Sequence, residues 1–587
     1  MTYEEMKAKI KSLPSGGITH KTIHGKKYTY YQWTENGKQK SRTVKPEELE
    51  QLQNQITERK ALQEELKSID LNAVSVVAKK IESNIFKTDV RINAALDAFI
   101  SPVTDYKKRE IYANLDSYVH GDFKDKVFIL YGLRRTGKTT LIRQIILNMS
   151  EVEKSQTAFL QINSTNNLRD VNNDLRLLEE AGYKYVFIDE VTLMDGFIEG
   201  AALFSDIFAS SGMKIVLSGT DSLGFLFSQD EQLYDRCIML HTTFISYREF
   251  ENVLGIKGVD EYIRFGGTMS QSGENYNKNI FSSKKTTDEY VNTAIARNIQ
   301  HSLKNYQNEG HFRGLYSLYE KNELTNAINR IVEDLNHRFT LDILTRKFKS
   351  HDFGSAKDLL LKDKENPSDS LYELNSEKIT SDLMNLLEIK NKEELLVGIE
   401  DCHRTEIKEY LELLDLICEI DIVNMTNLNQ KNTMIVFSQP GLRYSQAESL
   451  IKVLMNDELF KTFSLDERKH ITEKILEDVK GRMLEEIVLL ETKKANPELE
   501  VFKLQFAIGE FDMVIFDEDK GECQLFEIKH TNEPFENQYR HLTDQNKLAE
   551  TQNRFGKITR RCVLYRGNSL VLDNGIEYKN VEEFLKG

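Results

Sequence analysis

Residues 132–139 read GLRRTGKT, a glycine and four variable residues followed by Gly-Lys-Thr. This spacing is typical of a phosphate-binding loop, in which backbone N–H groups and the start of a helix surround the phosphates of a nucleotide. In that pattern Lys138 places its ammonium beside the β- and γ-phosphates, and the Thr139 hydroxyl is a ligand of Mg²⁺. The predicted nucleotide-binding residues here are Gly132, Arg135, Thr136, Gly137, Lys138, Thr139 and Thr140.

Two acids end a later apolar stretch, YKYVFIDE, at residues 183–190. Such sites need an acid at the end of a buried strand, so Asp189 is predicted to hold Mg²⁺ and Glu190 to polarise the attacking water. The alternative is that these acids only terminate the strand. The next apolar stretch, KIVLSGTDS, offers Ser218 and Thr220 as sensors of the γ-phosphate, and the sequence does not decide between them. ATP and Mg²⁺ are the expected cofactors, and ATP hydrolysis is the expected reaction.

A second group of charged residues lies near the C-terminus, in FDMVIFDEDKGECQLFEIKH at 511–530. The stretch reads as a β-hairpin with Asp512 on its first strand. Glu527 and Lys529 share one face of the second strand, because side chains two residues apart on a strand point the same way. Carboxylates that converge on a divalent cation, with a lysine near the attacking water, can hydrolyse phosphodiester bonds. The simpler interpretation is an ion pair on the solvated face of a hairpin.

The beginning of the chain is strongly basic. Between Lys7 and Pro46 there are ten Lys or Arg residues and one acid, Glu35, although the whole chain carries a net charge of −15. Short alternating segments predict a small β-rich module here, with aromatic residues among the cations. That combination suits stacking on bases and neutralisation of phosphates, whereas the alternative is a sheet whose aromatics form its core. The candidates for nucleic-acid contact are Lys27, Tyr31, Trp33, Lys38, Lys40 and Arg42.

The elements that must position the nucleotide residues are short apolar strands alternating with helices, which is the pattern of a parallel α/β sheet. The strands are expected at 126–132, 157–163, 183–190 and 213–219, so each polar group follows the end of a strand. A helix is expected from Pro46, because proline and acids favour a helix start.

VFILYGLRRTGKTTLIRQI resembles the archaeal-type ATPases, a clade of AAA+/STAND-like P-loop proteins in which paired arginines precede the Gly-Lys-Thr, as Arg134 and Arg135 do here. The resemblance continues through DEV, SGT, TTFISYREF and YIRFGGTMS, with Tyr247 and Arg248 as departures. It implies that Arg236 reaches the γ-phosphate in its own subunit or acts as an arginine finger in a neighbour's. The resemblance therefore leaves open whether the protein forms a homo-oligomer. The alternative interpretation of Arg236 is a surface or structural arginine.

The same clade carries a winged helix and, in many members, a C-terminal PD-(D/E)xK nuclease fold. Residues 337–361 read as two helices about a turn, 406–424 as a helix and a wing strand, and SQPGLRYSQ at 438–446 resembles a family signature with Gln439 in place of the usual acid. The resemblance implies a catalytic set of Glu485, Asp512, Glu527 and Lys529, in which Asp512 and Glu527 hold Mg²⁺ or Mn²⁺.

The predicted fold is an α/β multidomain chain with a P-loop parallel sheet, a helical and winged-helix middle, a C-terminal α/β restriction-endonuclease-like domain and a small basic β-rich N-terminal module plus helix. Its predicted divisions are the basic module (1–46), a helical linker (47–84), the ATPase core (85–270), a helical lid (271–335), the winged-helix region with an acidic insertion at 362–400 (336–445) and the nuclease-like domain (446–587).

The expected function is that of an ATP-binding and ATP-hydrolysing protein that acts on DNA through a metal-dependent nuclease, and family analogy places it in defence against foreign DNA or mobile-element biology. The alternative is a STAND-type signalling ATPase whose nuclease-like domain only binds DNA or a partner. The five cysteines are scattered, no apolar run is long enough to cross a membrane and the start lacks a signal peptide's apolar core. These features predict a cytoplasmic protein with no membrane contact.

Overall fold

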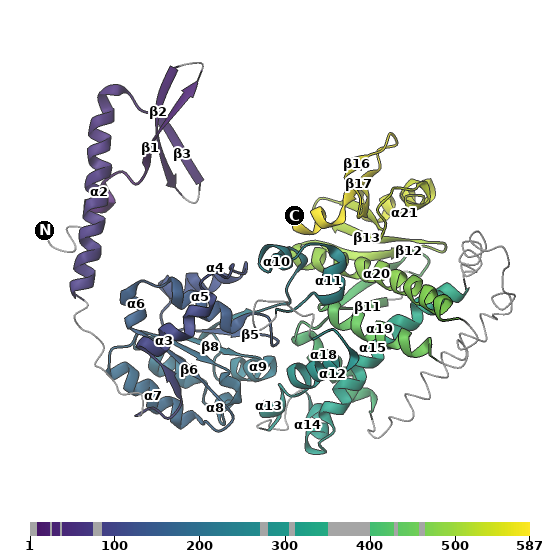
Figure 1. Ribbon diagram of the computed structural model, residues 1–587, viewed down its shortest axis with the longest axis horizontal. Coiled ribbons are helices and arrows are strands. Elements are labelled where there is room, and N and C mark those ends of the chain that lie inside the picture. The colour runs from purple at the N-terminus through teal and green to yellow at the C-terminus, as the bar shows by residue number, and fades with distance from the viewer. Residues whose placement is uncertain are drawn as a thin grey trace.

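The computed structural model describes residues 9–23, 26–35, 38–73, 85–269, 280–304, 312–349, 399–427, 432–456 and 464–587 (Figure 1). Almost all of the expected acidic insertion, and residues 350–361 of the expected helix pair, lie outside these ranges. Within the described residues no helix is long and apolar enough to cross a membrane. All five cysteines are free thiols.

The N-terminal unit is a three-stranded antiparallel sheet beside a long helix (Figure 1). Its elements are β1 (Gly17–Ile23), β2 (Lys26–Glu35), β3 (Lys38–Thr43) and α2 (Pro46–Ala73). Tyr31 of β2 and Val44, which directly follows β3, are buried against Leu52 and Ile56 of α2. The helix expected as a linker therefore shares a core with the sheet, because the apolar face of so small a sheet needs a partner.

The second unit is a six-stranded sheet in the order β4-β6-β7-β8-β5-β9, parallel except where β4 pairs with β6. The strands are β4 (Asp89–Arg91), β5 (Val127–Tyr131), β6 (Thr157–Gln161), β7 (Tyr185–Asp189), β8 (Lys214–Gly219) and β9 (Cys237–His241). Tyr131 pairs with Gly219, and Gln161 pairs with Asp189, so the carboxyl ends of these strands are level. The predicted parallel sheet is confirmed.

Helices cover both faces of this sheet, which explains why its strands are apolar throughout. Alternate residues of β5 enter two separate cores: Phe128 packs with α3, α4 and α5, whereas Ile129 packs with α7 and α9. The helices are α3 (Asn93–Ile100), η2 (Ser101–Val103), α4 (Tyr112–His120), α5 (Lys138–Asn148), α6 (Glu151–Ser155), α7 (Leu168–Glu180), η3 (Val191–Leu193), α8 (Phe197–Gly200), the π-helix η4 (Phe204–Ala209) and α9 (Ser222–Glu231).

The middle of the chain is helical. Its described elements are α10 (Tyr247–Asn252), α11 (Val259–Phe265), α12 (Lys284–Tyr290), the π-helix η6 (Val291–Ala296), α13 (Gln300–Lys304), α14 (Arg313–Glu320), α15 (Leu324–Lys349) and α18 (Asp401–Leu413). The division predicted between residues 335 and 336 falls inside α15. It is wrong because residues 337–349 continue one helix instead of starting a new helix pair.

The C-terminal sheet has eight strands in the order β11-β10-β12-β13-β14-β15-β17-β16. They are β10 (Ile417–Asn424), β11 (Asn432–Phe437), β12 (Glu500–Gln505), β13 (Glu510–Asp517), β14 (Glu522–Ile528), β15 (Lys557–Tyr565), β16 (Leu570–Val571) and β17 (Glu577–Asn580). The wing strand expected within residues 406–424 is β10, and it joins this sheet, because residues 422–424 of β10 pair with residues 503–505 of β12. The pairing gives hydrogen-bond partners to backbone groups of β12 that would otherwise lie at an exposed edge of the sheet.

Helices α19 (Pro440–Leu454), α20 (Leu465–Ala495) and α22 (Val581–Lys586) pack on one face of the C-terminal sheet, and α21 (Gln545–Phe555) packs on the other; η8 (Glu536–Gln538) and η9 (His541–Thr543) are single turns. The division predicted at 445/446 cuts α19 and is therefore wrong. One hydrophobic core contains residues of α10, α11, α19, α20, α22 and the strands. The C-terminal sheet is thus joined by a continuous apolar contact to α10 and α11, the helices that follow β9.

Candidate nucleotide and nuclease sites

The phosphate-binding loop lies between the end of β5 and the first residue of α5, the position that the sequence predicts. Gly132 has a φ of +139°, and a Cβ there would lie 2.5 Å from the carbonyl oxygen of Thr242, so only glycine fits. The Lys138 Nζ donates to the carbonyl oxygens of Gly132 and Leu133, both at 2.8 Å. Burial lowers the pKa of Lys138 to about 8, against the opposing effect of Glu190 and Asp189.

The predicted acids and hydroxyls converge beside this loop. The Thr139 hydroxyl donates to Asp189 Oδ2 at 2.8 Å, and the Ser218 hydroxyl donates to Asp189 Oδ1. The Thr220 hydroxyl donates to Glu190 Oε2 at 3.2 Å. Burial and the neighbouring Asp189 raise the pKa of Glu190. The structure therefore gives the two hydroxyls different partners: Ser218 contacts the acid proposed for Mg²⁺, and Thr220 contacts the acid proposed for water.

Arg236 does not reach the phosphate loop of its own subunit. Its carbonyl accepts from Val127 N at 3.0 Å, at the start of β5, whereas the loop follows Tyr131 at the strand's other end. Its guanidinium pairs with Asp206 at 2.9 Å, with about half of each side chain exposed. Five strand residues span roughly 16 Å, which is beyond the reach of an arginine. The predicted contact within one subunit is wrong, and the alternative of a surface ion pair fits the structure.

Arg109 is a residue of this site that no sequence pattern marks. It is buried beneath the loop, where its Nη1 donates to the Thr136 carbonyl at 2.7 Å. Its Nε donates to Glu249 Oε1 at 3.0 Å, and both side chains of this ion pair are almost inaccessible to solvent. Arg109 thus ties the phosphate loop to α10.

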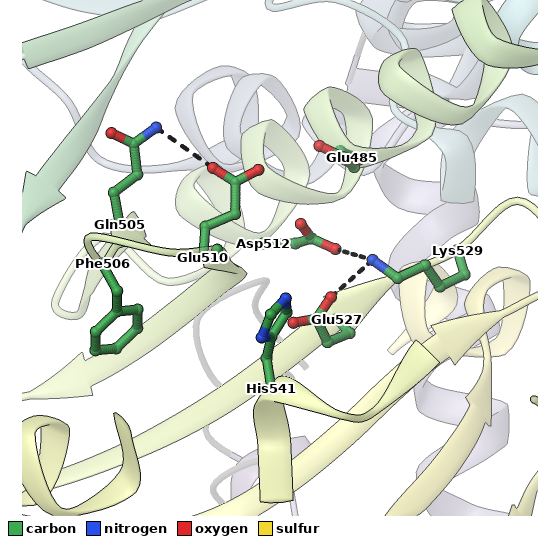
Figure 2. A pocket seen from close by; sticks show the side chains of 9 residues that line it. Glu485, Gln505, Phe506, Glu510, Asp512, Glu527, Lys529 and His541 are labelled. Atoms are coloured by element: carbon green, nitrogen blue, oxygen red, sulfur yellow. Dashed lines mark hydrogen bonds and ion pairs between the residues drawn. The ribbon is translucent and has the colours of Figure 1, made fainter. Parts of the chain in front are cut away.

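The second candidate site lies in the C-terminal sheet (Figure 2), where Asp512 of β13 and Glu527 of β14 point toward one another. The Lys529 Nζ lies 2.7 Å from Asp512 Oδ2 and 2.7 Å from Glu527 Oε2. Asp512 Oδ2 also accepts from the backbone N–H of Ile528 at 2.8 Å. The structure therefore brings these three predicted residues together, with both carboxylates buried.

The pKa values of Asp512 and Glu527 are shifted in opposite directions by their surroundings. Although burial opposes it, the ammonium groups of Lys529 and Lys503 hold the pKa of Asp512 well below its usual range. Burial and the Asp512 charge raise the pKa of Glu527 well above its usual range. Glu527 Oε1 is buried and has no hydrogen-bond partner in the structure. A buried carboxylate oxygen without a partner has a strong need for a cation or a donor.

Both carboxylates line a cavity of about 540 Å³. Glu485, the predicted helical acid, enters it from α20 (Figure 2). The Glu485 Oε2 lies 2.6 Å from Arg482 and 3.2 Å from the Lys503 Nζ. The complete lining is Glu485, Gln505, Phe506, Gly509, Glu510, Asp512, Glu527, Lys529 and His541. Lys503 is a neighbour of the pocket that the sequence analysis did not predict. Its position could have been noticed, because Lys503 is the single charged residue within the apolar run VFKL.

The oxygen atoms of this pocket meet part of what a divalent cation requires. Carboxylate oxygens suit Mg²⁺ and Mn²⁺, and Asp512 and Glu527 offer them at one point. In the part of the chain that the structure describes, however, no group of three or more His, Cys, Asp or Glu is arranged to hold a metal ion. The residues fit a cation held by two carboxylates and water, which is the usual mode for Mg²⁺.

The two candidate sites are connected by polar contacts as well as by the shared core. Glu491 of α20 accepts from the backbone N–H of Tyr247 in α10 at 2.7 Å. Asp260 of α11 contacts His530 Nε2 at 2.8 Å and Arg566 Nη2 at 2.7 Å. His530 directly follows Lys529, so α10 contacts the helix that carries Glu485, and α11 contacts the residue that follows Lys529.

In the N-terminal module, Tyr31 belongs to the core. Its ring is covered by α2 and stacks on Trp33 at 5.1 Å, so the prediction that Tyr31 stacks on bases is wrong. Arg42 pairs with Glu48 at 3.0 Å, and Lys40 is exposed. Lys27 and Lys38 lie on β2 and β3, and their side chains are outside the described residues.

Comparison with known proteins assigns part of the chain. Residues 124–251, from β5 to α10, match the AAA domain family. The chain carries an AAA domain. This range contains every nucleotide-binding residue predicted from the sequence, and ATP binding at the phosphate loop follows from it. Residues 3–54 match a domain of unknown function, DUF6788, which covers the three strands and the start of α2.

Solved structures give weaker likenesses. The Aeropyrum pernix ORC1 protein in complex with DNA is 12% identical over 60% of this chain and 92% of that chain, with a TM-score of 0.20. The S. cerevisiae Hsp104–ADP complex is 14% identical over 65% of this chain and 47% of that chain, with a TM-score of 0.19. Likenesses at these scores decide nothing about the function of this chain. No curated protein matches it.

Proposed function

We propose that this chain is an ATP-hydrolysing protein that acts on DNA and cuts phosphodiester bonds in the pocket between β13, β14 and α20. The observation that carries the proposal is the convergence of Asp512 and Glu527 on one point, with the buried Glu527 Oε1 left without a partner. A solvated hairpin with ordinary ion pairs would not bury two carboxylates in a cavity.

The chain's own residues account for binding and positioning in this pocket. Asp512 and Glu527 would hold a divalent cation, which when bound supplies an activated water and offsets charge on the phosphate. Lys529 fixes the two carboxylates at one point and presents an ammonium to the same cavity. His541 also lines the cavity, and its Nδ1 lies 2.6 Å from the Lys547 Nζ, so this wall can attract a phosphate.

At the nucleotide site, Thr139 and Asp189 would hold Mg²⁺, and Glu190 would orient the attacking water. The contacts of α10 and α11 with α20 and His530 offer a direct route by which nucleotide binding changes the cutting pocket. The basic N-terminal module, together with the exposed Lys40, supplies a further site for DNA phosphates. No described residue bears on a role in defence against foreign DNA or in mobile-element biology.

One observation favours the second candidate, a nucleotide-controlled switch whose nuclease-like domain only binds. Every acid that lines the pocket has at least one cation beside it, and for Glu527 this cation is Lys529. A pocket with its charges balanced in this way can bind a backbone phosphate through its lysines without cutting. The two candidates differ in whether the pocket cleaves DNA, a reaction that the first candidate assigns to Asp512 and its neighbours.

The test is cleavage of plasmid and linear DNA with Mg²⁺ or Mn²⁺, with and without ATP. Wild type is compared with Asp512→Ala and with Lys138→Ala, which removes the phosphate-loop ammonium. We expect cleavage by wild type, none by Asp512→Ala, and loss of ATP stimulation in Lys138→Ala. If Asp512→Ala cuts as well as wild type, the proposed cutting site is wrong. If wild type binds DNA without cutting under all these conditions, the binding-only switch is supported.

A further inference from the structure

Lys503 is a second lysine of the nuclease-like pocket, and it is more deeply buried than Lys529. It belongs to β12, and its side chain is 1% exposed. The Lys503 Nζ lies 2.8 Å from Glu510 Oε1, 3.2 Å from Glu485 Oε2 and 4.0 Å from Asp512 Oδ1. Three acids from α20 and β13 therefore surround one ammonium group.

Asp512 is shared between two such positions. Its Oδ2 faces the Lys529 ammonium, which also contacts Glu527. Its Oδ1 faces the Lys503 ammonium, which also contacts Glu485 and Glu510. One carboxylate that bridges two cation positions, each completed by further acids, is the arrangement found in enzymes that use two metal ions.

We propose that Lys503 permanently occupies the second of these cation positions, so that the pocket takes one divalent cation, at Asp512 and Glu527. This inference rests on the proposed function. Lys529 can leave its position because 29% of its side chain is exposed, whereas the side chain of Lys503 is 1% exposed and is held by contacts with Glu485 and Glu510. A second effect follows, namely that Lys503 keeps Glu485 and Glu510 beside Asp512 without needing a metal.

Among the described residues, those of this pocket included, no three-acid metal group is found. The acids of the pocket alternate with Lys503 and Lys529, so each ammonium separates carboxylates that would otherwise meet. Replacing Lys503 with methionine keeps most of the volume of the side chain and removes its charge. The three acids around it would then form a carboxylate group open to a cation.

The experiment counts Mn²⁺ ions by equilibrium titration and electron paramagnetic resonance, without nucleotide, in the full chain. Wild type, Lys503→Met and the control Lys529→Met are each compared with the same protein carrying Asp512→Asn, so that ions elsewhere are subtracted. We expect one Asp512-dependent ion in wild type and in Lys529→Met. We expect two in Lys503→Met, with the broadened signal of two manganese ions close together.

Two Asp512-dependent Mn²⁺ ions in wild type or in Lys529→Met would overturn the inference. Either result would be compatible with the proposed function. One ion in a folded Lys503→Met, checked by circular dichroism, would overturn the inference as well. No Asp512-dependent ion in wild type would overturn the proposed cutting site and this inference together. If Lys503→Met does not fold, the counts in wild type and Lys529→Met still decide, because one ion in each supports the inference.

Discussion

Arg109 offers a direct test of how the phosphate loop is held. The guanidinium and the Glu249 carboxylate are 3% and 6% exposed. Arg109→Met removes the cation, leaves Glu249 charged in a buried site and frees the Thr136 carbonyl from its donor at 2.7 Å. Breaking a buried ion pair by removing one partner costs about 3–5 kcal/mol of unfolding free energy.

A loss of this size lowers the melting temperature by roughly 6–20 °C, at 2–4 °C for each kcal/mol in a domain of this class. Thr136 precedes Gly137 and Lys138, so a loosened loop should also bind ATP more weakly. The double variant Arg109→Met/Glu249→Gln leaves no unpaired charge, and it should recover part of the lost stability.

The assay is thermal unfolding followed by a dye, with and without ADP, combined with titration of a fluorescent ATP analogue. The single variant should melt well below wild type and bind the analogue several-fold more weakly. A single variant that melts within about 2 °C of wild type would refute the assigned role, since the expected loss is several times larger. A double variant less stable than the single one would refute the electrostatic explanation.

Three further predictions concern the contacts between the units and the basic module. Burial raises the pKa of Glu491 from 4.5 to about 7, so the folded chain keeps a proton that the unfolded chain releases between these values. Its unfolding free energy should therefore fall by about 3 kcal/mol as the pH rises from 4.5 to 7, and Glu491→Gln should flatten that dependence in melting curves. Gly267 has a φ of +98°, and a Cβ there would lie 2.6 Å from Gln439 Cα, whereas Gly258 has a φ of +100° and open space. Both alanine variants should lose about 1–3 kcal/mol to backbone strain, but Gly267→Ala should lose more, and equal losses would argue against the clash. Replacing Lys38, Lys40 and Arg42 by Ala should weaken DNA binding and reduce the salt slope by up to about 0.9 for each lost phosphate contact; an unchanged slope would favour a purely structural sheet.

The sequence by itself determined the nucleotide site because that site is built from local patterns. A phosphate loop needs one strand, one turn and one helix in succession, and all three are contiguous from β5 to α5. The faces of Glu527 and Lys529 also followed from spacing alone, since side chains alternate along a strand. Asp512 lies opposite this pair because a short turn joins β13 to β14 in antiparallel register.

Only the tertiary structure decided which charged residues serve these sites. Arg109 and Glu249 are 140 positions apart, so their contact depends on how α10 packs beneath the loop. Arg236 lies at the amino end of β5, whereas the phosphate loop follows its carboxyl end. The reason is that Arg236 directly precedes β9, which runs parallel to β5. Tyr31 is not available to stack on bases because α2 packs against the sheet and covers its ring. Three acids surround Lys503 because α20, β12 and β13 pack together, a convergence that side-chain spacing along the chain does not encode.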